Sequence, residues 1–257
     1  MEVAVSILMS VYNPDFNLLR QAFDSINSQT YKNYELIIVN DGCENRTLLE
    51  TLGNYNFKYS VIVNSTNLGL TKSLNIGLKN CSGKYIARHD ADDLMEVGRL
   101  EKQVEFLDSN KDIACVFSNA KRVDINGNVV SVEQNDNNSS IVKKLIYGGN
   151  CLYHSSLMIR KEVLEDLNGY DEKIVYAQDY DLYLRLINKY KIYKIPEPLI
   201  CFRTDNYISK SKSVLSLLYS YYGSIKYVLA TGKISVFWIR TIRVIRALHK
   251  VVKDKAE

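Results

Sequence analysis

The sequence predicts an α/β fold, in which a Rossmann-like half is followed by a half with a mixed sheet and then by a helical C-terminal tail. Three observations indicate this fold. Short apolar runs alternate with segments of helical periodicity in the first part of the chain. Strand, hairpin and helix signals follow in a different order, and the chain ends in a basic, amphipathic segment. We therefore expect three parts, at residues 1–110, 111–205 and 206–257.

The first half begins with a predicted βαβ unit. Its strands are the apolar runs at 3–10 and 35–40, and apolar residues at helical spacing predict a helix at 17–27 between them. Strands that are buried on both faces have such continuous apolar runs. The remaining predicted elements of this half are a strand at 59–64, a helix at 70–78, a strand at 84–89 and a helix at 94–107.

The second half has a strand signal at 115–124, followed by the hairpin turn Asn126-Gly127-Asn128. We expect the very polar stretch at 131–140 to be a mobile loop. The segment Ile195-Pro196-Glu197-Pro198 is expected to break the chain before the last strand. The other predicted elements are helices at 141–147 and 179–190 and that last strand at 199–203.

The composition is that of a soluble globular protein, with 46% hydrophobic and 24% charged residues. The five cysteines include no Cys-x-x-Cys pair, which favours a reducing cytosol and gives no support to zinc or redox chemistry. The chain has no run of 18 apolar residues and no apolar N-terminal segment long enough for a signal peptide. These features predict a cytoplasmic protein.

Polar residues follow three of the predicted strands, at the edge where open α/β sheets bind ligands. They include an aromatic ring, amides, a lone carboxylate and a cluster of carboxylates. In chain order they are Ser10, Tyr12 and Asn13 after the first strand, Asp41 after the second, and Asp90, Asp92 and Asp93 after the fourth.

The cluster of carboxylates predicts a divalent cation. Three carboxylates within four positions repel one another by roughly 3 kcal/mol per pair, at ~6 Å and an effective dielectric constant of about 20. A cation removes this repulsion, and carboxylate ligands favour Mn²⁺ or Mg²⁺ shared with substrate phosphates. The alternative is a solvated acidic turn in which Asp93 caps the next helix. The position at a strand end favours the cation.

The chain resembles the family 2 glycosyltransferases, which are inverting enzymes with the GT-A fold. The resemblance extends from residue 3 to about residue 205, in the order and at the spacing of that family. The matching stretches are VSILMSVYN at 5–13, QTYKNYELIIVNDG at 29–42, NLGLTKSLNIG at 67–77, GKYIARHDADD at 83–93, GYD at 169–171 and QDYDLYLRL at 178–186.

The resemblance implies a binding site for a nucleotide-sugar donor. Tyr12 would stack on the nucleobase, Asp41 would accept a hydrogen bond from a ring N–H, and Asp90 would hold the ribose. Asp92 would ligate the metal, which stabilises charge on the departing nucleotide. The remaining residues assigned to the donor are Ser10, Asn13, Asn67 and Lys72, although Lys72 is about equally well explained as a surface lysine.

The resemblance also implies that Asp179 is the general base, which takes the proton of the attacking hydroxyl. The alternative for Asp179 is a carboxylate favoured by the dipole of the helix that it begins, and both can hold together. We expect Asp181 and Arg185 to form a structural pair. His154 is a candidate for the acceptor pocket, or else a structural histidine. Gln178 stands where the family usually has a glutamate.

The family's usual Asp-Gly-Ser-Thr-Asp after the second strand is Asp41-Gly42-Cys43-Glu44-Asn45 here. We expect this loop to cap a helix.

The tail is expected to form a helix with separate basic and apolar faces. Residues 232–257 contain seven Lys or Arg against two acidic residues. Such a helix, with Trp238 at the interface, suits an anionic membrane surface through residues 233–253. The alternative is a helix packed on the protein with a solvated basic face. Nucleic acid is not expected, because no matching basic patch occurs elsewhere. The basic residues of the expected face are Arg240, Arg243, Arg246, Lys250 and Lys253.

These features together predict a metal-dependent, inverting hexosyltransferase. The expected donor is a UDP-hexose or UDP-N-acetylhexosamine, and the acceptor is a hydroxyl of a glycan or lipid-linked molecule. We expect it to act in capsule, O-antigen or exopolysaccharide assembly, peripherally at the inner face of the plasma membrane.

A non-catalytic module that binds a nucleotide sugar or a membrane is the main alternative. A phosphatase of the haloacid-dehalogenase type would have its Asp-x-Asp after the first strand. A sugar-1-phosphate nucleotidyltransferase would need a glycine-rich loop with an arginine where Tyr12-Asn13-Pro14-Asp15 stands.

Overall fold

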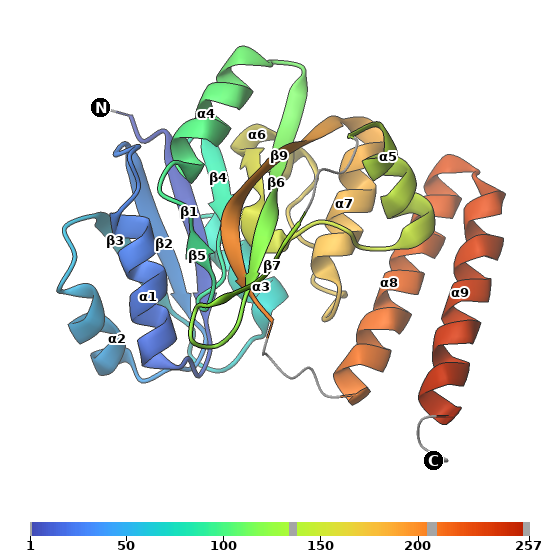
Figure 1. The fold of residues 1–257 in the computed structure, drawn as a ribbon, viewed down its shortest axis with the longest axis horizontal. Coiled ribbons are helices and arrows are strands. Elements are labelled where there is room, and N and C mark those ends of the chain that lie inside the picture. Colours follow the sequence, from blue (N-terminus) through green and yellow to red (C-terminus); the bar gives the residue numbers. More distant parts are fainter. Residues whose placement is uncertain (1, 134–137, 205–209, 254–257) are drawn as a thin grey trace.

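Both halves of the chain share one mixed sheet. The computed structural model describes residues 2–133, 138–204 and 210–253. Figure 1 shows helices on both faces of the sheet. Within the described part of the chain, the sheet has nine strands in the order β3-β2-β1-β4-β8-β6-β9-β5, and β7 pairs with β6. The predicted α/β fold is confirmed.

The first half is a parallel sheet whose strands alternate with helices. β1 pairs in parallel with β2 and β4, and β2 pairs in parallel with β3. Each element predicted for residues 3–89 is present. The elements are β1 (Val5–Val11), α1 (Phe16–Asn27), β2 (Tyr34–Asn40), α2 (Asn45–Leu52), β3 (Lys58–Val63), α3 (Leu70–Leu78) and β4 (Tyr85–Arg88).

The continuous apolar runs of the central strands arise because both faces of the sheet are covered. In β1, Leu8 packs into the cluster that contains residues of α3, whereas Ile7 and Met9 pack into the cluster that contains residues of α1. All three side chains are fully buried. The expected cap after β2 is also present, since the Glu44 carboxylate accepts hydrogen bonds from the first backbone N–H groups of α2.

The second half joins the first through β8, which pairs antiparallel with β4 and with β6. β6 and β7 form the predicted hairpin, and β6 pairs in parallel with β9. β5 pairs antiparallel with the end of β9. The bounds of these strands are β5 (Leu94–Met95), β6 (Ile113–Val123), β7 (Val129–Val132), β8 (Met158–Arg160) and β9 (Lys191–Arg203).

The helix predicted at 94–107 was placed five residues too early. α4 spans Arg99–Ser109, because Leu94 and Met95 pair with β9 instead. The backbone N–H of Met95 is further held by Ser25 Oγ of α1, at 3.0 Å. Tertiary pairing therefore outweighs the helical spacing of these first residues.

The predicted break at 195–198 is also wrong, since β9 runs through both prolines. The pairing of β6 with β9 shifts register on either side of Asn119, opposite this segment. Asn119 Nδ2 donates to the carbonyl oxygen of Pro196 at 2.8 Å. An irregular ladder of this kind accommodates prolines, which cannot donate a backbone hydrogen bond.

The polar stretch at 131–140 is only partly as expected. Residues 131–132 belong to β7 and residues 138–140 to α5 (Asn138–Lys143), while residues 134–137 lie outside the described part of the chain. The helix expected at 141–147 is the end of α5 followed by a π turn (Lys144–Gly148). Neither β8 nor α6 (Lys161–Asp166) was predicted from the sequence, because both elements are short.

The tail folds into two helices, α8 (Lys210–Thr231) and α9 (Ile234–Lys253), which lie side by side in Figure 1. α8 packs on α7 (Gln178–Lys189), and α9 packs on α8 and on the π turn. Gly232, with φ of +70°, forms the turn between the helices. None of the helices in the described ranges is long and apolar enough to cross a membrane.

The packing of α9 divides the expected basic face: Arg240 is buried, whereas Arg243 and Arg246 are exposed. Arg240 is buried at 4% exposure, and Arg243 Nη1 donates to the carbonyl oxygen of Gly148 at 2.9 Å. Apolar side chains of α9 are exposed as well, namely those of Trp238, Ile242 and Ile245. The packing of α9 on α8 and on the π turn therefore removes Arg240 from the expected basic face.

Candidate active site

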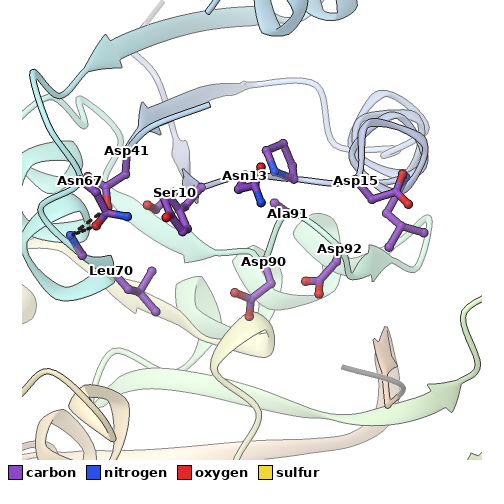
Figure 2. A pocket seen from close by; sticks show the side chains of 13 residues that line it. Ser10, Asn13, Asp15, Asp41, Asn67, Leu70, Asp90, Ala91 and Asp92 are labelled. Atoms are coloured by element: carbon purple, nitrogen blue, oxygen red, sulfur yellow. Dashed lines mark hydrogen bonds between the residues drawn. The ribbon is translucent and has the colours of Figure 1, made fainter. Parts of the chain in front are cut away.

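A cavity of about 420 Å³ opens at the carboxyl ends of β1, β2 and β4. Figure 2 shows Asp41 and Asn67 at one end of it and Asp15 at the other, with Asp90 and Asp92 between them. We call it the first cavity. Its lining brings together most of the residues assigned to the donor: Ser10, Tyr12, Asn13, Asp41, Asn67, Asp90 and Asp92.

Lys72 is not part of this group. It lies on α3 with its side chain exposed, and it lines none of the cavities described here. Its alternative explanation as a surface lysine agrees with this position.

Asp41 organises the loop before α3. Its Oδ1 accepts from Asn64 Nδ2 at 2.7 Å and from the Leu68 N–H at 2.8 Å, and its Oδ2 accepts from the Gly69 N–H at 2.9 Å. A carboxylate can accept about four hydrogen bonds. Capacity for one further donor therefore remains at the wall of the first cavity.

Tyr12 has an aromatic ring that is 61% exposed. The ring lies against Gly42, where a Cβ atom would come within 3.3 Å of two ring carbons. Gly42 also has φ of +125°, a conformation that favours glycine. The backbone of Gly42 therefore supports the Tyr12 ring at the edge of the cavity.

The carboxylates of the acidic turn do not point the same way. Asp90 and Asp92 line the first cavity, whereas Asp93 is buried. Asp93 accepts hydrogen bonds from Ser155 Oγ at 2.5 Å and from the Arg203 N–H at 3.0 Å. Burial, and then the charge of Asp90, raises the pKa of Asp93 to about 8.

The repulsion expected among three charged carboxylates is thus relieved partly by Asp93 itself, because burial favours the neutral form of this carboxyl group. Asp93 does not cap α4 either, because Gly98 stands at that cap position. The alternative role considered for Asp93 is therefore wrong.

The two remaining carboxylates fit a cation that is shared with a substrate. In the described ranges no group of three or more His, Cys, Asp or Glu side chains could hold a metal. Mg²⁺ and similar cations are often held by only one or two carboxylates together with phosphates and water. Asp90 and Asp92 offer such an incomplete set.

Two more cavities adjoin the first, and Asp90 lines all three. The second cavity, of about 560 Å³, lies between the π turn, α7, α8 and α9. The third, of about 470 Å³, lies toward β6 and β9. Asp179, Asn150 and His154 line both the second and the third. The site assigned to the donor and the site assigned to the acceptor therefore meet at Asp90.

Asp179 lies in the first turn of α7. Its Oδ1 accepts from the Tyr180 N–H at 2.8 Å, and its Oδ2 accepts from Asn150 Nδ2 at 2.6 Å. Burial raises the pKa of Asp179, and these two hydrogen bonds oppose the shift. The charge of Asp90 raises the pKa of Asp179 further, because both carboxylates line the second cavity and like charges repel.

The neighbouring Asp181 and Arg185 form the expected pair, at 2.8 Å. The pair extends to α8, because Lys226 Nζ donates to Asp181 Oδ1 at 2.8 Å. Arg185 also donates to the carbonyl oxygens of Leu167 and Gly169. α7 is thereby fixed on both sides, and Asp179 with it.

His154 has a structural partner and lines both acceptor-side cavities. Its Nε2 lies 2.8 Å from the hydroxyl of Tyr170. Burial, with the charge of Arg88, keeps the pKa of His154 well below its usual value. The imidazole is therefore neutral at physiological pH.

The polar residues of the second cavity that the sequence analysis did not assign to a site include Arg88, Asn150 and Arg240. Arg88 is 1% exposed and donates to Asp90 Oδ1 at 2.5 Å. Its position at the end of an otherwise apolar strand could have identified Arg88 as a candidate site residue. No feature of the sequence pointed to Asn150, and Arg240 was assigned to the basic face of the tail helix.

Comparisons with known proteins give the family of this α/β chain. The profile of the family "Glycosyl transferase family 2" matches residues 6–167. This chain therefore belongs to glycosyltransferase family 2.

Relatives agree with this. An uncharacterized glycosyltransferase of Methanocaldococcus jannaschii is 37% identical over 226 residues, which are 85% of this chain and 77% of that protein. The putative glycosyltransferase EpsE of Bacillus subtilis is 32% identical, over 81% of this chain and 76% of its own length. The O-antigen biosynthesis glycosyltransferase WbnJ of Escherichia coli is 32% identical, over 72% of each chain.

Solved structures show the same GT-A-like fold. TarS of S. aureus (residues 1–349) in complex with UDP matches with a TM-score of 0.67 at 18% identity, over 86% of this chain and 65% of that one. The complex of TarS with UDP-GlcNAc gives a TM-score of 0.68 at the same identity. This chain spans about two thirds of that structure.

Proposed function

We propose that this protein is an inverting glycosyltransferase that moves a hexose or N-acetylhexosamine from a UDP-linked donor to a hydroxyl group. One observation carries the proposal: the cavity lined by Asp41 and Asp92 meets the cavities lined by Asp179 at Asp90. A donor in the first cavity would thus present its reacting carbon toward a carboxylate whose pKa is raised.

The first cavity has the groups that a nucleotide requires. The exposed face of Tyr12 suits stacking on uracil, and the free acceptor capacity of Asp41 suits a ring N–H. Asp90 would hold the ribose. The other lining residues assigned to the donor are Ser10, Asn13 and Asn67.

Asp92, beside Asp90, would hold Mn²⁺ or Mg²⁺ together with the donor's diphosphate. When bound, the cation supplies Lewis-acid stabilisation of the charge on the departing nucleotide.

Asp179 would act as the base. It takes the proton of the acceptor hydroxyl while the oxygen attacks the anomeric carbon from the face opposite the nucleotide. The bond between that carbon and the diphosphate oxygen breaks, and its electron pair leaves with the nucleotide. A base works best with a pKa nearer the working pH, and burial moves that of Asp179 in this direction.

We further propose that the acceptor is a glycan or a lipid-linked molecule in cell-surface polysaccharide assembly, and that the protein contacts the membrane from the cytoplasm. The exposed apolar side chains of α9 support a contact with lipid, and the exposed Arg246 on the same helix would favour anionic headgroups.

A panel of nucleotide sugars tests the donor assignment through thermal unfolding. We expect UDP and UDP-sugars to raise the unfolding temperature only when Mn²⁺ or Mg²⁺ is present, and Asp92→Ala to abolish the shift. Protection by no nucleotide, or equal protection of Asp92→Ala, would contradict the proposal.

A further inference from the structure

Arg240 of α9 is a buried cation that forms hydrogen bonds with neutral side chains. Its side chain lines the second cavity and is 4% exposed. Nε donates to Ser224 Oγ at 3.1 Å, and Nη2 donates to Ser220 Oγ at 3.4 Å. Its guanidinium carbon lies 5.3 Å from the centre of the Tyr180 ring. In the ranges that the structure describes, no carboxylate forms an ion pair with it.

An arrangement of this kind costs free energy, because a buried charge is normally paired. Neutral hydroxyl groups orient the guanidinium but leave its charge uncompensated. The structure thus holds a preoriented, bidentate donor at a cavity wall, as recognition of a phosphate requires.

The same cavity connects Arg240 to the proposed base. Gly149 has φ of +103°, and a Cβ atom there would lie 2.9 Å from Arg240 Nη1. The next residue, Asn150, donates to Asp179 Oδ2. The absence of a side chain at Gly149 lets the guanidinium lie against the loop that holds Asp179.

The other charged groups of this cavity are already engaged with one another or with neutral donors. Asp90 accepts from Arg88, and Asp179 accepts from Asn150 and the Tyr180 N–H. Arg88 keeps Nε and Nη1 without hydrogen-bond partners although both atoms are buried. Arg88 and Arg240 therefore both have N–H groups at this cavity that can donate to further acceptor atoms.

We propose that Arg240 binds a phosphate group of the acceptor, and so places the acceptor hydroxyl near Asp179. This inference rests on the proposed function. The phosphate is not that of the donor, because Arg240 does not line the first cavity, in which the donor's diphosphate is placed. A lipid-linked phosphate suits the site well, since the opposite side of the same helix exposes Trp238, Ile242 and Ile245.

Binding of geranyl phosphate and of geraniol to the full chain tests this proposal, with the first cavity saturated by UDP and Mn²⁺. We expect the phosphate to bind roughly tenfold or more tightly than the alcohol, as a charge-assisted hydrogen bond requires. Arg240→Gln should remove that preference, and Arg240→Lys should restore part of it. Arg46→Gln, a change of an exposed arginine on α2, should leave it intact.

Ser220→Asp provides a second test in case Arg240→Gln unfolds. The new carboxylate would pair with Nη2, which now lies 3.4 Å from Ser220 Oγ, and should abolish the preference for phosphate without removing the arginine. Retention of the preference in folded Arg240→Gln or Ser220→Asp protein would overturn the proposal, as would equal affinities of the wild-type protein for both compounds.

Inorganic phosphate distinguishes the source of the group. Weaker binding of inorganic phosphate than of geranyl phosphate, with both lost in Arg240→Gln, indicates a lipid-linked phosphate. Equal binding of the two, again lost in the variant, indicates a soluble phosphorylated acceptor. Thermal shift with UDP and Mn²⁺ is scored separately, so failure of the donor site and failure of the phosphate site are distinguishable.

Discussion

Asn150 Nδ2 donates a hydrogen bond of 2.6 Å to Asp179 Oδ2, and thereby stabilises the charged form of the carboxylate. The bond opposes the effect of burial, which raises the pKa of Asp179. The two residues come from segments that are 29 positions apart, namely the loop after the π turn and the start of α7. The activity of the proposed base thus depends on a loop that the sequence did not single out.

Asn150→Ala should therefore raise the pKa of Asp179 further. The acidic limb of the pH profile for transfer would move to higher pH, because more of the base is protonated at a given pH. Transfer rates across the acidic range measure this shift. Asn126→Ala, in the exposed turn between β6 and β7, serves as the control and should leave the limb in place. A limb that does not move in Asn150→Ala would count against Asp179 as the titrating base.

Tyr12→Ala should weaken binding of UDP without destabilising the fold, because the ring is largely exposed. Aromatic stacking on a base contributes about 1–3 kcal/mol, so the dissociation constant should rise by roughly 5- to 150-fold. Tyr12→Phe should bind UDP almost as tightly as the wild-type protein. Calorimetric titration with UDP and Mn²⁺ checks both. Equal affinities of all three proteins would refute stacking at this position.

Arg203→Ala should make the acidic turn less rigid, although Arg203 is far from the turn in the sequence. Arg203 Nε donates to the carbonyl oxygen of Asp92 at 2.6 Å, and the Arg203 N–H donates to Asp93. Loss of the guanidinium would free the turn and lower the affinity for UDP with Mn²⁺ more than that for UDP alone. It should also destabilise the protein by about 1.5–3 kcal/mol, because the carbonyl oxygens that the guanidinium binds lose a charged donor.

Arg20→Ala, a change of an exposed arginine on α1, is the matched control for this variant. Denaturant unfolding and nucleotide titration measure the two effects. If Arg203→Ala kept the full effect of Mn²⁺ on UDP binding, Arg203 would have no role in positioning Asp92.

Glu35→Gln should destabilise the protein in a pH-dependent way. Burial raises the pKa of Glu35, but hydrogen bonds from Ser82 and Ser6 and the nearby Lys58 outweigh it and lower the pKa to about 2. Because the folded pKa lies below the unfolded one, the contribution is present above about pH 4.3 and is lost as the pH falls toward 2. We expect a loss of about 2–3 kcal/mol at pH 7 and little difference near pH 2. Glu50→Gln, on the surface, is the control; a pH-independent difference for Glu35→Gln would contradict this account.

Trp238 reports on the proposed membrane contact. It is the single tryptophan of the chain, and its side chain is 61% exposed. Anionic vesicles should shift its fluorescence to shorter wavelength, because the indole leaves water. Ile242→Glu should reduce the shift, whereas Val129→Glu, on the exposed β7, should not. An unchanged spectrum at high concentrations of anionic lipid would remove the membrane from the proposal.

The Rossmann-like half was predicted well from the sequence, because strands that are buried on both faces have continuous apolar runs. The run from Val5 to Val11 is apolar since helices cover both sides of β1, and the polar residues after each strand had to meet at one edge. Asp41, Asp90 and Asp92 were found in this way. Local pattern and long-range packing agree in this part of the chain.

Elsewhere packing decided what local pattern could not. Asp93 looked like a third charged ligand, but its burial depends on Ser155 and Arg203, which are 62 and 110 residues away. Arg240 belonged to a basic face by helical period, yet α8 and the π turn enclose it. In β9, Pro196 signalled a break, but the irregular pairing with β6 accommodates it.

Transfer by Asp179→Asn protein, measured next to its affinity for UDP with Mn²⁺, is the most direct test of the assignment of the two sites. We predict that turnover falls about 100-fold or more while the affinity for UDP stays within about twofold of the wild-type value, because the proposed donor site is the other cavity. Unchanged turnover would contradict the account, and would leave the protein without its proposed base.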